Sequence, residues 1–283
     1  MKETWLRGNR NSFIEADEID IGENVHFGSR VEIKCRGRFS IGDNSYIGDR
    51  FQANAENLII GEYFYNKPTD SRGMVIGGGG SDWPWANCTI GDKVTCHTGH
   101  INLAREVRIG NGVGLSHDVD ILTHGFWQSY LEGFPNQFGS VWIEDGVIIG
   151  WKTTILPGLV IAKDVVVGSN SVVTKTLDRA RSIYAGNPAK FIKEVPVTEI
   201  WHKQERLRNI YQEWMRLMNH YNARHSMTLN YPYVKINKLM IHVENMTCTG
   251  EHDEVTDAFR DFLRRYGIRV FHPRGFPFNL ERK

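Results

Sequence analysis

Four histidines, His97, His100, His117 and His124, lie close together in the sequence, and histidine is the side chain best suited to proton transfer. An imidazole with an ordinary pKa of about 6.5 accepts and returns protons near neutral pH, and its ring nitrogens also bind metal ions. The remaining histidines are His26, near the N-terminus, and a set that follows residue 200. The stretch from His97 to His124 is therefore where this chain concentrates its capacity for acid–base chemistry or for holding a metal.

An aliphatic residue followed by glycine recurs through the first two thirds of the chain, and this repeat must position the histidines. Its clearest run places aliphatic residues six apart, at Ile149, Ile155, Ile161, Val167 and Val173. A six-residue unit fits one short strand and a turn, and three such sides make a triangular coil of about eighteen residues that stacks on the next at about 4.8 Å. The period predicts a prism-shaped parallel β-helix. The alternative is an antiparallel sandwich with glycine turns, but sandwich strands do not keep a fixed six-residue phase.

Composition sets broad limits on the protein class. The 283 residues are 41% hydrophobic and 24% charged, as in ordinary globular proteins. The 34 basic and 33 acidic residues give a net charge of +1, which provides no electrostatic footprint for nucleic acid or an anionic membrane. The N-terminus has no apolar signal region and no window is long enough to span a membrane, so we expect a cytoplasmic protein without a transmembrane segment.

The cysteines indicate neither a disulfide framework nor a zinc knuckle. The chain has 4 cysteines, Cys35, Cys88, Cys96 and Cys248, and they are widely spread without a paired CxxC motif. We expect them to be small buried hydrophobic residues.

The first predicted domain, residues 1–195, is the β-helix, with loop insertions at about 62–89 and 125–140 where the repeat is lost. The first insertion carries a run of glycines with Trp83 and Trp85, and the second is also rich in aromatic residues, including Trp127. Aromatic side chains on such loops often form the walls of binding sites, although the loops would also serve simply to cover apolar edges.

The second predicted domain, residues 196–283, is a helix followed by a small extension. Apolar residues at helical spacing predict a long amphipathic helix over 198–221. A strand over 233–243, a helix over 254–266 and a strand over 268–271 would complete a strand-helix-strand unit. This unit is too small to be stable without packing on a neighbour.

One segment resembles a known family. The run IIGWKTTILPGLVIAKDVVVGSNSVVTK, followed by YAGNPAKFIK, is similar to the closing signature of the hexapeptide-repeat acyltransferases, a group that includes galactoside, maltose and xenobiotic acetyltransferases. The Gly-Asn-Pro-Ala-Lys segment after the last coil is its most specific part, and the resemblance covers about residues 19–195. It implies a left-handed coil, a homotrimer with active sites between adjacent prisms, acetyl-CoA as the donor and no metal.

The resemblance also implies roles for particular residues. Acyl transfer needs a base for the acceptor proton, donors for the oxyanion and a groove for the carrier. His124, in DILTHGFW, resembles the catalytic histidine that precedes a loop in this family, and is expected to be the general base. The backbone N–H of Trp151, which follows Ile149-Gly150, is expected to stabilise the oxyanion, although most relatives have a small residue there. Asn102 resembles an asparagine that binds the acceptor.

The remaining site predictions concern the two substrates. Residues predicted to bind the acceptor are Asn102, His117, His100, Trp83, Trp85 and Trp127. Residues predicted to bind coenzyme A are Gly150, Trp151, Lys175, Asn187, Lys190 and Lys193. His97 is expected to be structural or to line the cleft, and either Asp118 or Asp120 is a candidate to hold a histidine tautomer.

The leading functional hypothesis is an acetyl-CoA-dependent O-acetyltransferase that modifies a sugar hydroxyl of a cell-surface polysaccharide or its precursor, because aromatic side chains suit the apolar faces of sugar rings. A close variant is N-acetylation of an amino sugar carried on a nucleotide. From another class, the histidines are numerous enough for a β-helix carbonic anhydrase, in which three histidines from two subunits hold a metal, although the Gly-Asn-Pro-Ala-Lys ending favours the acyltransferases. A non-catalytic scaffold is the last alternative.

Overall fold

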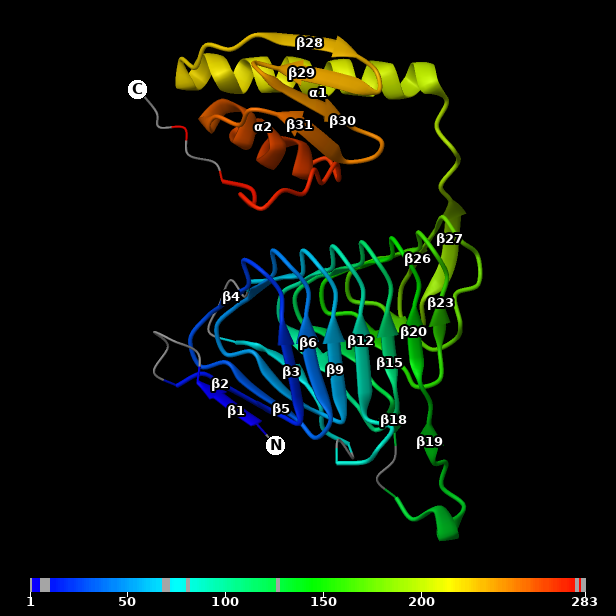
Figure 1. Cartoon of the computed structure of the whole chain (residues 1–283). Helices are drawn as coiled ribbons and strands as arrows, with labels where there is room; N and C mark the ends of the chain where they lie inside the picture. The colour runs from blue at the N-terminus through cyan, green and yellow to red at the C-terminus, as the bar shows by residue number, and fades with distance from the viewer. Residues whose placement is uncertain are drawn as a thin grey trace. The chain divides into compact units, whose positions relative to one another are not determined.

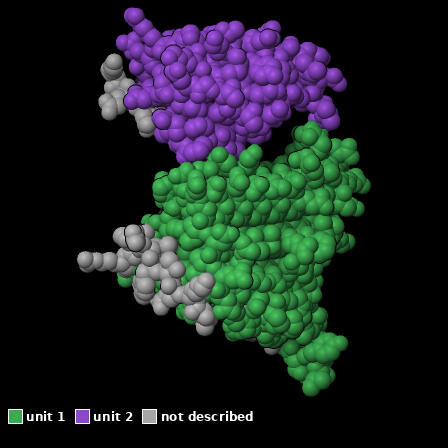
Figure 2. All heavy atoms as spheres, viewed as in Figure 1, with its two compact units in different colours: residues 1–195 green, residues 196–283 purple. Residues whose placement is uncertain are grey.

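The computed structural model describes residues 2–5, 11–67, 72–79, 82–125, 128–277 and 280 (Figure 1). The chain divides into two compact units, residues 1–195 and 196–283, which are coloured separately in Figure 2. Each unit has its own buried core, so each is described by itself.

The first unit is a prism whose faces are three sheets, named here faces A, B and C. Face A contains β1 (Lys2–Trp5), β2 (Phe13–Ala16), β5 (Glu32–Cys35), β8 (Gln52–Ala55), β11 (Met74–Ile76), β14 (Gly99–Ile101), β17 (Val119–Ile121), β22 (Thr154–Ile155) and β25 (Val172–Val173). Face B contains β3 (Glu18–Ile21), β6 (Arg38–Ile41), β9 (Asn57–Ile60), β12 (Asn87–Ile90), β15 (Val107–Ile109), β20 (Val141–Ile143) and β23 (Val160–Ile161). Face C contains β4 (His26–Phe27), β7 (Tyr46–Ile47), β10 (Tyr65–Asn66), β13 (Thr95–Cys96), β16 (Gly114–Leu115), β21 (Ile148–Ile149), β24 (Val166–Val167), β26 (Ser182–Ala185) and β27 (Lys190–Glu194).

Stacking of equivalent residues builds the core of the prism. On face B, parallel pairing aligns one aliphatic residue from each coil, and these are Ile41, Ile60, Ile90, Ile109, Ile143 and Ile161. All of them are buried. The strands of face B, nearest the viewer in Figure 1, run upward while successive coils advance from left to right, so the coil is left-handed. The predicted left-handed parallel β-helix is confirmed.

The passage 62–89 contributes strands to the β-helix and is not the single loop expected from the sequence. Strands β10 and β11 lie within it and pair with the coils on either side. The repeat is hidden because Asn66 takes a core position: it is fully buried, and its Nδ2 donates to the carbonyls of Cys96 and His97 at 3.2 and 2.7 Å.

The passage 125–140 is an excursion from the corner between β17 and β20. It begins and ends with an antiparallel pair, β18 (His124–Gly125) and β19 (Gln137–Phe138), and carries a short 3-10 helix, η1 (Tyr130–Glu132). The position of this loop is therefore predicted well from the sequence, but the antiparallel pairing of β18 with β19 at its base is not.

The second unit contains α1 (Ile200–Tyr221), an antiparallel sheet of β28 (Met227–Asn230), β29 (Tyr233–Ile236), β30 (Leu239–His242) and β31 (Thr247–Gly250), and α2 (Glu254–Arg264). Trp214 of α1 is fully buried against Phe259 and Phe262 of α2, at ring-centroid distances of 5.1 and 5.3 Å. No helix in the described part of the chain is both long and apolar enough to cross a membrane.

Two details of the expected strand-helix-strand extension are wrong. The single strand expected over 233–243 is two strands, because Asn237 adopts a left-handed conformation (φ 49°) and reverses the chain between β29 and β30. Residues 268–271, all of which are described, form no strand. The carbonyl of Val270 instead accepts hydrogen bonds from the buried guanidinium of Arg260, at 3.2 and 3.1 Å.

Candidate active site

His124 lies at the edge where face A turns into face B, here called the A/B edge and formed, among the described residues, by 77–79, 82–86, 102–106, 122–125 and 128–140. Its Nδ1 is 2.8 Å from Oδ1 of Asn102. The backbone N–H groups of Ala104 and Thr123 also point at this Oδ1, both at 3.3 Å, which identifies it as the amide oxygen. Because an amide oxygen only accepts hydrogen bonds, the proton resides on Nδ1, and Nε2 of His124 retains a lone pair.

Asn102 is an internal support rather than an exposed ligand. Its side chain is 2% exposed, and Thr123 donates a further hydrogen bond to Oδ1 from Oγ1 at 2.6 Å. The sequence places Asn102 among the acceptor-binding residues and makes Asp118 or Asp120 a candidate to hold a histidine tautomer. In the structure the amide of Asn102 holds the tautomer of His124, and burial of that amide separates it from the surface.

The two aspartates lie elsewhere on face A. Asp120 is opposite His100 in the pairing of β14 with β17, and burial raises the pKa of its carboxyl. Partial burial also pushes the pKa of Asp118 upward, but hydrogen bonds from Arg72, Thr98 and Trp151 outweigh it and hold the pKa below its ordinary value.

The glycine run after β11 lies directly on His124. The Nε2 of His100 is 2.9 Å from the carbonyl oxygen of Gly77, and donation from that nitrogen ties the run to β14. Gly79 has φ +64°, and a Cβ there would lie 2.4 Å from Cε1 of His124 and 2.5 Å from Nδ2 of Asn102. Only glycine permits so close an approach of backbone to imidazole.

An aromatic wall continues from His124. The ring of Phe138 stacks on His124 at 6.2 Å, and Trp83 lies 6.3 Å from Phe138 and 5.0 Å from Trp85. The guanidinium of Arg105 lies over Phe138 at 4.4 Å and over Trp85 at 5.0 Å. The predicted acceptor residues Trp83 and Trp85, each 42% exposed, are thus brought beside His124.

Several members of this wall carry no signal in the sequence. Phe138 and Arg105 belong to no motif, and only the folded chain brings them to His124. Trp127, a predicted acceptor residue, lies outside the described residues.

His117 and Trp151 occupy the opposite edge, where face C turns into face A, here called the C/A edge. The ring of His117 stacks on that of His97 at 4.3 Å, and Nε1 of Trp151 lies 3.4 Å from Oδ2 of Asp118. The backbone N–H of Trp151 makes no hydrogen bond to any residue that the structure describes, and its side chain is half exposed. This N–H is available to an external oxygen.

Face A separates the two edges within one chain. From Asp118 to Leu122 the chain takes four steps along β17, or roughly 13 Å at the rise of an extended strand. Trp151 is aligned with the start of this strand, because Asp120 pairs with Thr154, whereas His124 follows its end. The imidazole of His124 and the N–H of Trp151 in one chain are therefore too far apart to act on one carbonyl group.

The residues predicted to bind coenzyme A lie in the last coils. Gly150 packs closely on the next coil, since a Cβ there would lie 2.5 Å from the backbone N of Ser169. Lys175, Asn187, Lys190 and Lys193 are all exposed, the last two on β27. Among the residues that the structure describes, no group of three or more histidine, cysteine or acidic side chains is arranged to hold a metal ion.

A family model described as the hexapeptide repeat of succinyl-transferase matches residues 18–49 and 140–175. These two segments of the chain therefore carry hexapeptide repeats. The chain's resemblance to the hexapeptide-repeat acyltransferases, predicted from the closing signature, is confirmed.

Two relatives align with a part of the repeat protein. A probable macrolide acetyltransferase of Lysinibacillus sphaericus is 45% identical over 120 residues, which cover 37% of this chain and 62% of the relative. WbbJ of Escherichia coli (strain K12), a putative lipopolysaccharide biosynthesis O-acetyl transferase, is 34% identical over 116 residues, which cover 37% and 59%. The chain thus spans about three fifths of the length of the curated relatives that it matches.

The solved structures that are similar to this chain have lower sequence identity. The polysialic acid O-acetyltransferase OatWY has a TM-score of 0.43 and 22% identity, and the match covers 69% of this chain and 98% of that one. The N-acyltransferase AntD of Bacillus cereus, solved with dTDP and coenzyme A, has a TM-score of 0.39 and 21% identity, with coverage of 69% and 91%.

Proposed function

We propose that this hexapeptide-repeat protein is an acetyl-CoA-dependent O-acetyltransferase that acts on a sugar hydroxyl, with His124 as the general base. The observation that carries the proposal is the hydrogen bond from Nδ1 of His124 to Oδ1 of Asn102, 2.8 Å long, which fixes the proton on Nδ1 and so makes Nε2 the basic nitrogen of the ring. The acetyltransferase names of the two sequence relatives support the same reaction class.

The reaction follows from these groups. Nε2 of His124 takes the proton of the acceptor hydroxyl while its oxygen attacks the thioester carbonyl of acetyl-CoA. The backbone N–H of Trp151 donates to the oxyanion that forms. The tetrahedral intermediate then collapses with cleavage of the C–S bond, and the imidazolium returns the proton to the leaving thiolate. The products are an acetyl ester and free coenzyme A.

A second copy of the chain completes the site. Since face A separates His124 from Trp151 within one chain, the imidazole of one subunit must work with the N–H of its neighbour. We infer a closed homotrimer, in which each A/B edge meets the C/A edge of the next subunit, a heterologous contact that rotational symmetry can close.

The aromatic wall supports a sugar acceptor. Trp83, Trp85 and Phe138 present large flat faces next to His124, and such faces pack against the C–H surfaces of sugar rings. Acetylation of a polysaccharide or its precursor is the finer form of the proposal.

Release of free thiol from acetyl-CoA, measured with a panel of oligosaccharides and nucleotide sugars, tests the function. We expect thiol release to depend on an acceptor and His124→Ala to lower kcat/KM for a hydroxyl acceptor by about 10² to 10⁴. An amino sugar that arrives deprotonated needs less help, so its acetylation would be less affected. His26→Ala, at an exposed position of β4 on face C, is the histidine control.

Unchanged activity of the His124→Ala variant with a hydroxyl acceptor would overturn the assignment of the base. Absence of thiol release with every acceptor would overturn the reaction class itself.

A further inference from the structure

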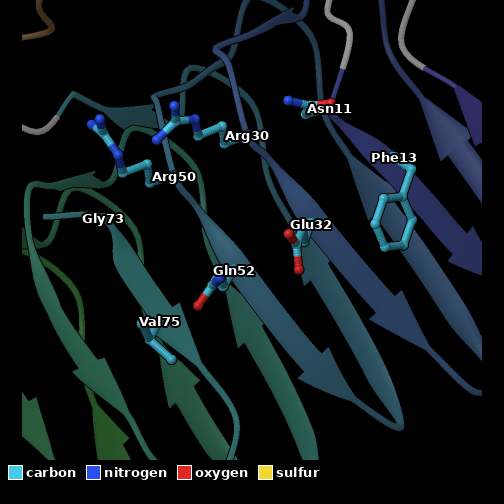
Figure 3. Close-up of a pocket in the computed structure, with 8 residues that line it drawn as sticks. All are labelled: Asn11, Phe13, Arg30, Glu32, Arg50, Gln52, Gly73 and Val75. Carbon is cyan, nitrogen blue, oxygen red and sulfur yellow. The ribbon is translucent and has the colours of Figure 1, made fainter. Parts of the chain in front are cut away.

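A hollow of about 610 Å³ lies on face A, over the first coils of the prism (Figure 3). It is lined by outward residues of β2, β5, β8 and β11, among them Phe13, Glu32 and Gln52, and by Arg30 and Arg50 at one end. Figure 3 shows the two arginines reaching the same end of this hollow. No role in the proposed acetyl transfer has yet been assigned to it.

The hollow leads toward His124. A second hollow of about 300 Å³ shares Glu32, Gln52 and Val75 with the first and extends to Gly78 and His100. The next residue, Gly79, is the one that lies against the imidazole of His124. The two hollows form a continuous track along face A, here called the face A track, from Arg30 to the edge that carries the proposed base.

Arg30 and Arg50 make the far end of the track positive. They occupy equivalent turns of successive coils, because the N–H of Arg50 donates to the carbonyl of Ser29 at 2.8 Å. Asp49 accepts hydrogen bonds from the N–H and Oγ of Ser29 at 2.8 and 3.0 Å, and these bonds and the charges of Arg50 and Arg30 lower the pKa of its carboxyl. The side chains of Arg30 and Arg50 form no ion pair with any described residue, so both guanidiniums present donors to a ligand.

The rest of the track offers polar and aromatic surface. Lys34 lies over the ring of Phe13 at 5.4 Å, which adds a third cation, and Glu32 is the acid among the lining residues. Exposed amides at Gln52 and Asn54 follow along β8. This mixture of amides, an aromatic face and excess positive charge suits a polyhydroxylated chain with acidic groups.

Length is the remaining constraint. Gln52, Val75, His100 and Asp120 are aligned on successive coils, so Arg50 lies three coils from the coil of His124. At the strand spacing of about 4.8 Å, that separation is about 14 Å along the prism axis. A single sugar ring cannot reach both the arginines and the base.

We propose that the face A track binds an extended acidic oligosaccharide, with Arg30 and Arg50 holding a carboxylate or phosphate several sugars away from the hydroxyl presented to His124. The inference rests on the proposed acetyl transfer and specifies the class of its acceptor. The arginines bind and orient the chain and take no part in the chemical step.

Direct binding by calorimetry, without acetyl-CoA, tests the track. The probes are oligogalacturonate, maltohexaose carrying phosphate groups and unmodified maltohexaose of equal length. We expect at least one acidic chain to bind more than tenfold more tightly than the neutral chain, with an affinity that falls as salt rises. The double variant Arg30→Ala with Arg50→Ala should bind that acidic chain about tenfold or more weakly than the unmodified protein, because two charge-assisted contacts are lost. Which acidic chain binds separates a carboxylate from a phosphate.

The matched control removes two arginines from face B, Arg38→Ala with Arg108→Ala, and should leave binding unchanged. Arg30→Lys with Arg50→Lys keeps the charges and should give an intermediate affinity, so the test does not depend on one variant. Equal binding of acidic and neutral chains, no binding of either acidic chain, or equal losses in both alanine pairs would overturn the proposal. Thiol release with a short neutral acceptor, unaffected in the Arg30/Arg50 variant, separates failure of the track from failure of the acetyltransferase.

Discussion

Asn102 sets the chemical state of His124 through a single oxygen atom. Its Oδ1 receives hydrogen bonds from Nδ1 of His124, from Oγ1 of Thr123 and from two backbone N–H groups. Because the backbone N–H groups of Ala104 and Thr123 already hold this oxygen in place, the amide of Asn102 cannot rotate to follow the imidazole. The ring is held instead, with Nε2 directed away from the protein support.

Asn102→Ala should therefore impair both catalysis and folding. We expect kcat to fall by about tenfold to a hundredfold, less than the effect of losing the base itself. The free energy of unfolding should fall by about 1–3 kcal/mol, because buried donors lose their acceptor. Ser45→Ala is the control, since it removes the buried acceptor of the Phe64 N–H, at 3.1 Å, on a distant edge. An equal loss of kcat in both variants would show that Asn102 acts only through stability.

The sequence predicted His124 and the two tryptophans near it, but not the residues in contact with the imidazole, and the reason is physical. His124 stands in a local motif that a family resemblance can recognise. The tautomer-holding residue lies a full coil earlier in the chain, Arg105 lies beside it on that earlier coil, and Phe138 reaches the site through a long excursion. Contacts between residues so far apart in the sequence depend on which coils stack on each other and where each loop rejoins the prism. The residue types near His124 do not predict either of these.

The buried thiols give a prediction on pH. Burial raises the pKa of the Cys35 and Cys96 thiols to about 12, and also raises the pKa of Cys88, from an ordinary 9.0. Below about pH 9 the thiols are neutral in both states, and their burial favours the folded state in full. As the pH rises from about 9 to about 12, thiols in the unfolded state ionise first, so the free energy of unfolding falls progressively.

Native protein treated with iodoacetamide at pH 8 should therefore be modified first at Cys248, the half-buried thiol. Peptide mass spectrometry measures the extent at each position, and urea should make all 4 cysteines react. Modification of Cys88 in the native state at the rate of Cys248 would contradict the buried core.

At the scale of elements, the six-residue period predicts most of the prism because each coil needs only one aliphatic residue per face. The prediction fails where a polar residue takes a core position, as Asn66 does, since its hydrogen bonds to the next coil replace apolar packing. It also fails in the second unit, where Asn237 turns one apparent strand into two. The same run of apolar residues fits either arrangement until the turn is known.

The glycine run after β11 must keep its position most closely, because Gly79 lies directly against the imidazole of His124. Gly79→Ala should abolish most activity, because the new methyl group would meet Cε1 of His124 at 2.4 Å and displace the imidazole. Gly112→Ala is the matched control: its φ is +65° against +64°, and nothing lies within 4 Å of its Cβ position. Both variants should lose about 1 kcal/mol of stability from backbone strain, measured by urea unfolding. Comparable activity of the two variants would contradict the close contact with His124.

At the scale of the whole molecule, the prism separates groups that a single reaction needs together. His124 follows the end of β17, whereas the N–H of Trp151 is level with its start. A single chain therefore carries two half-sites. The proposed reaction therefore requires association of copies, and a test of activity can reveal whether two subunits share one site.

Subunit complementation provides that test. His124→Ala removes the base, and Trp151→Pro removes the backbone donor at a turn position where proline is tolerated, as Pro157 before Gly158 (φ +79°) shows at another corner. Each variant alone should be inactive. When the two are unfolded together and refolded as mixed trimers, about a quarter of the sites should combine an intact imidazole with an intact N–H from the next subunit, and about that share of activity should return. The control mixes the two variants after separate refolding, which leaves the subunits unexchanged. No recovery in mixed trimers, verified by mass spectrometry of the intact assembly, would show that one chain supplies both groups.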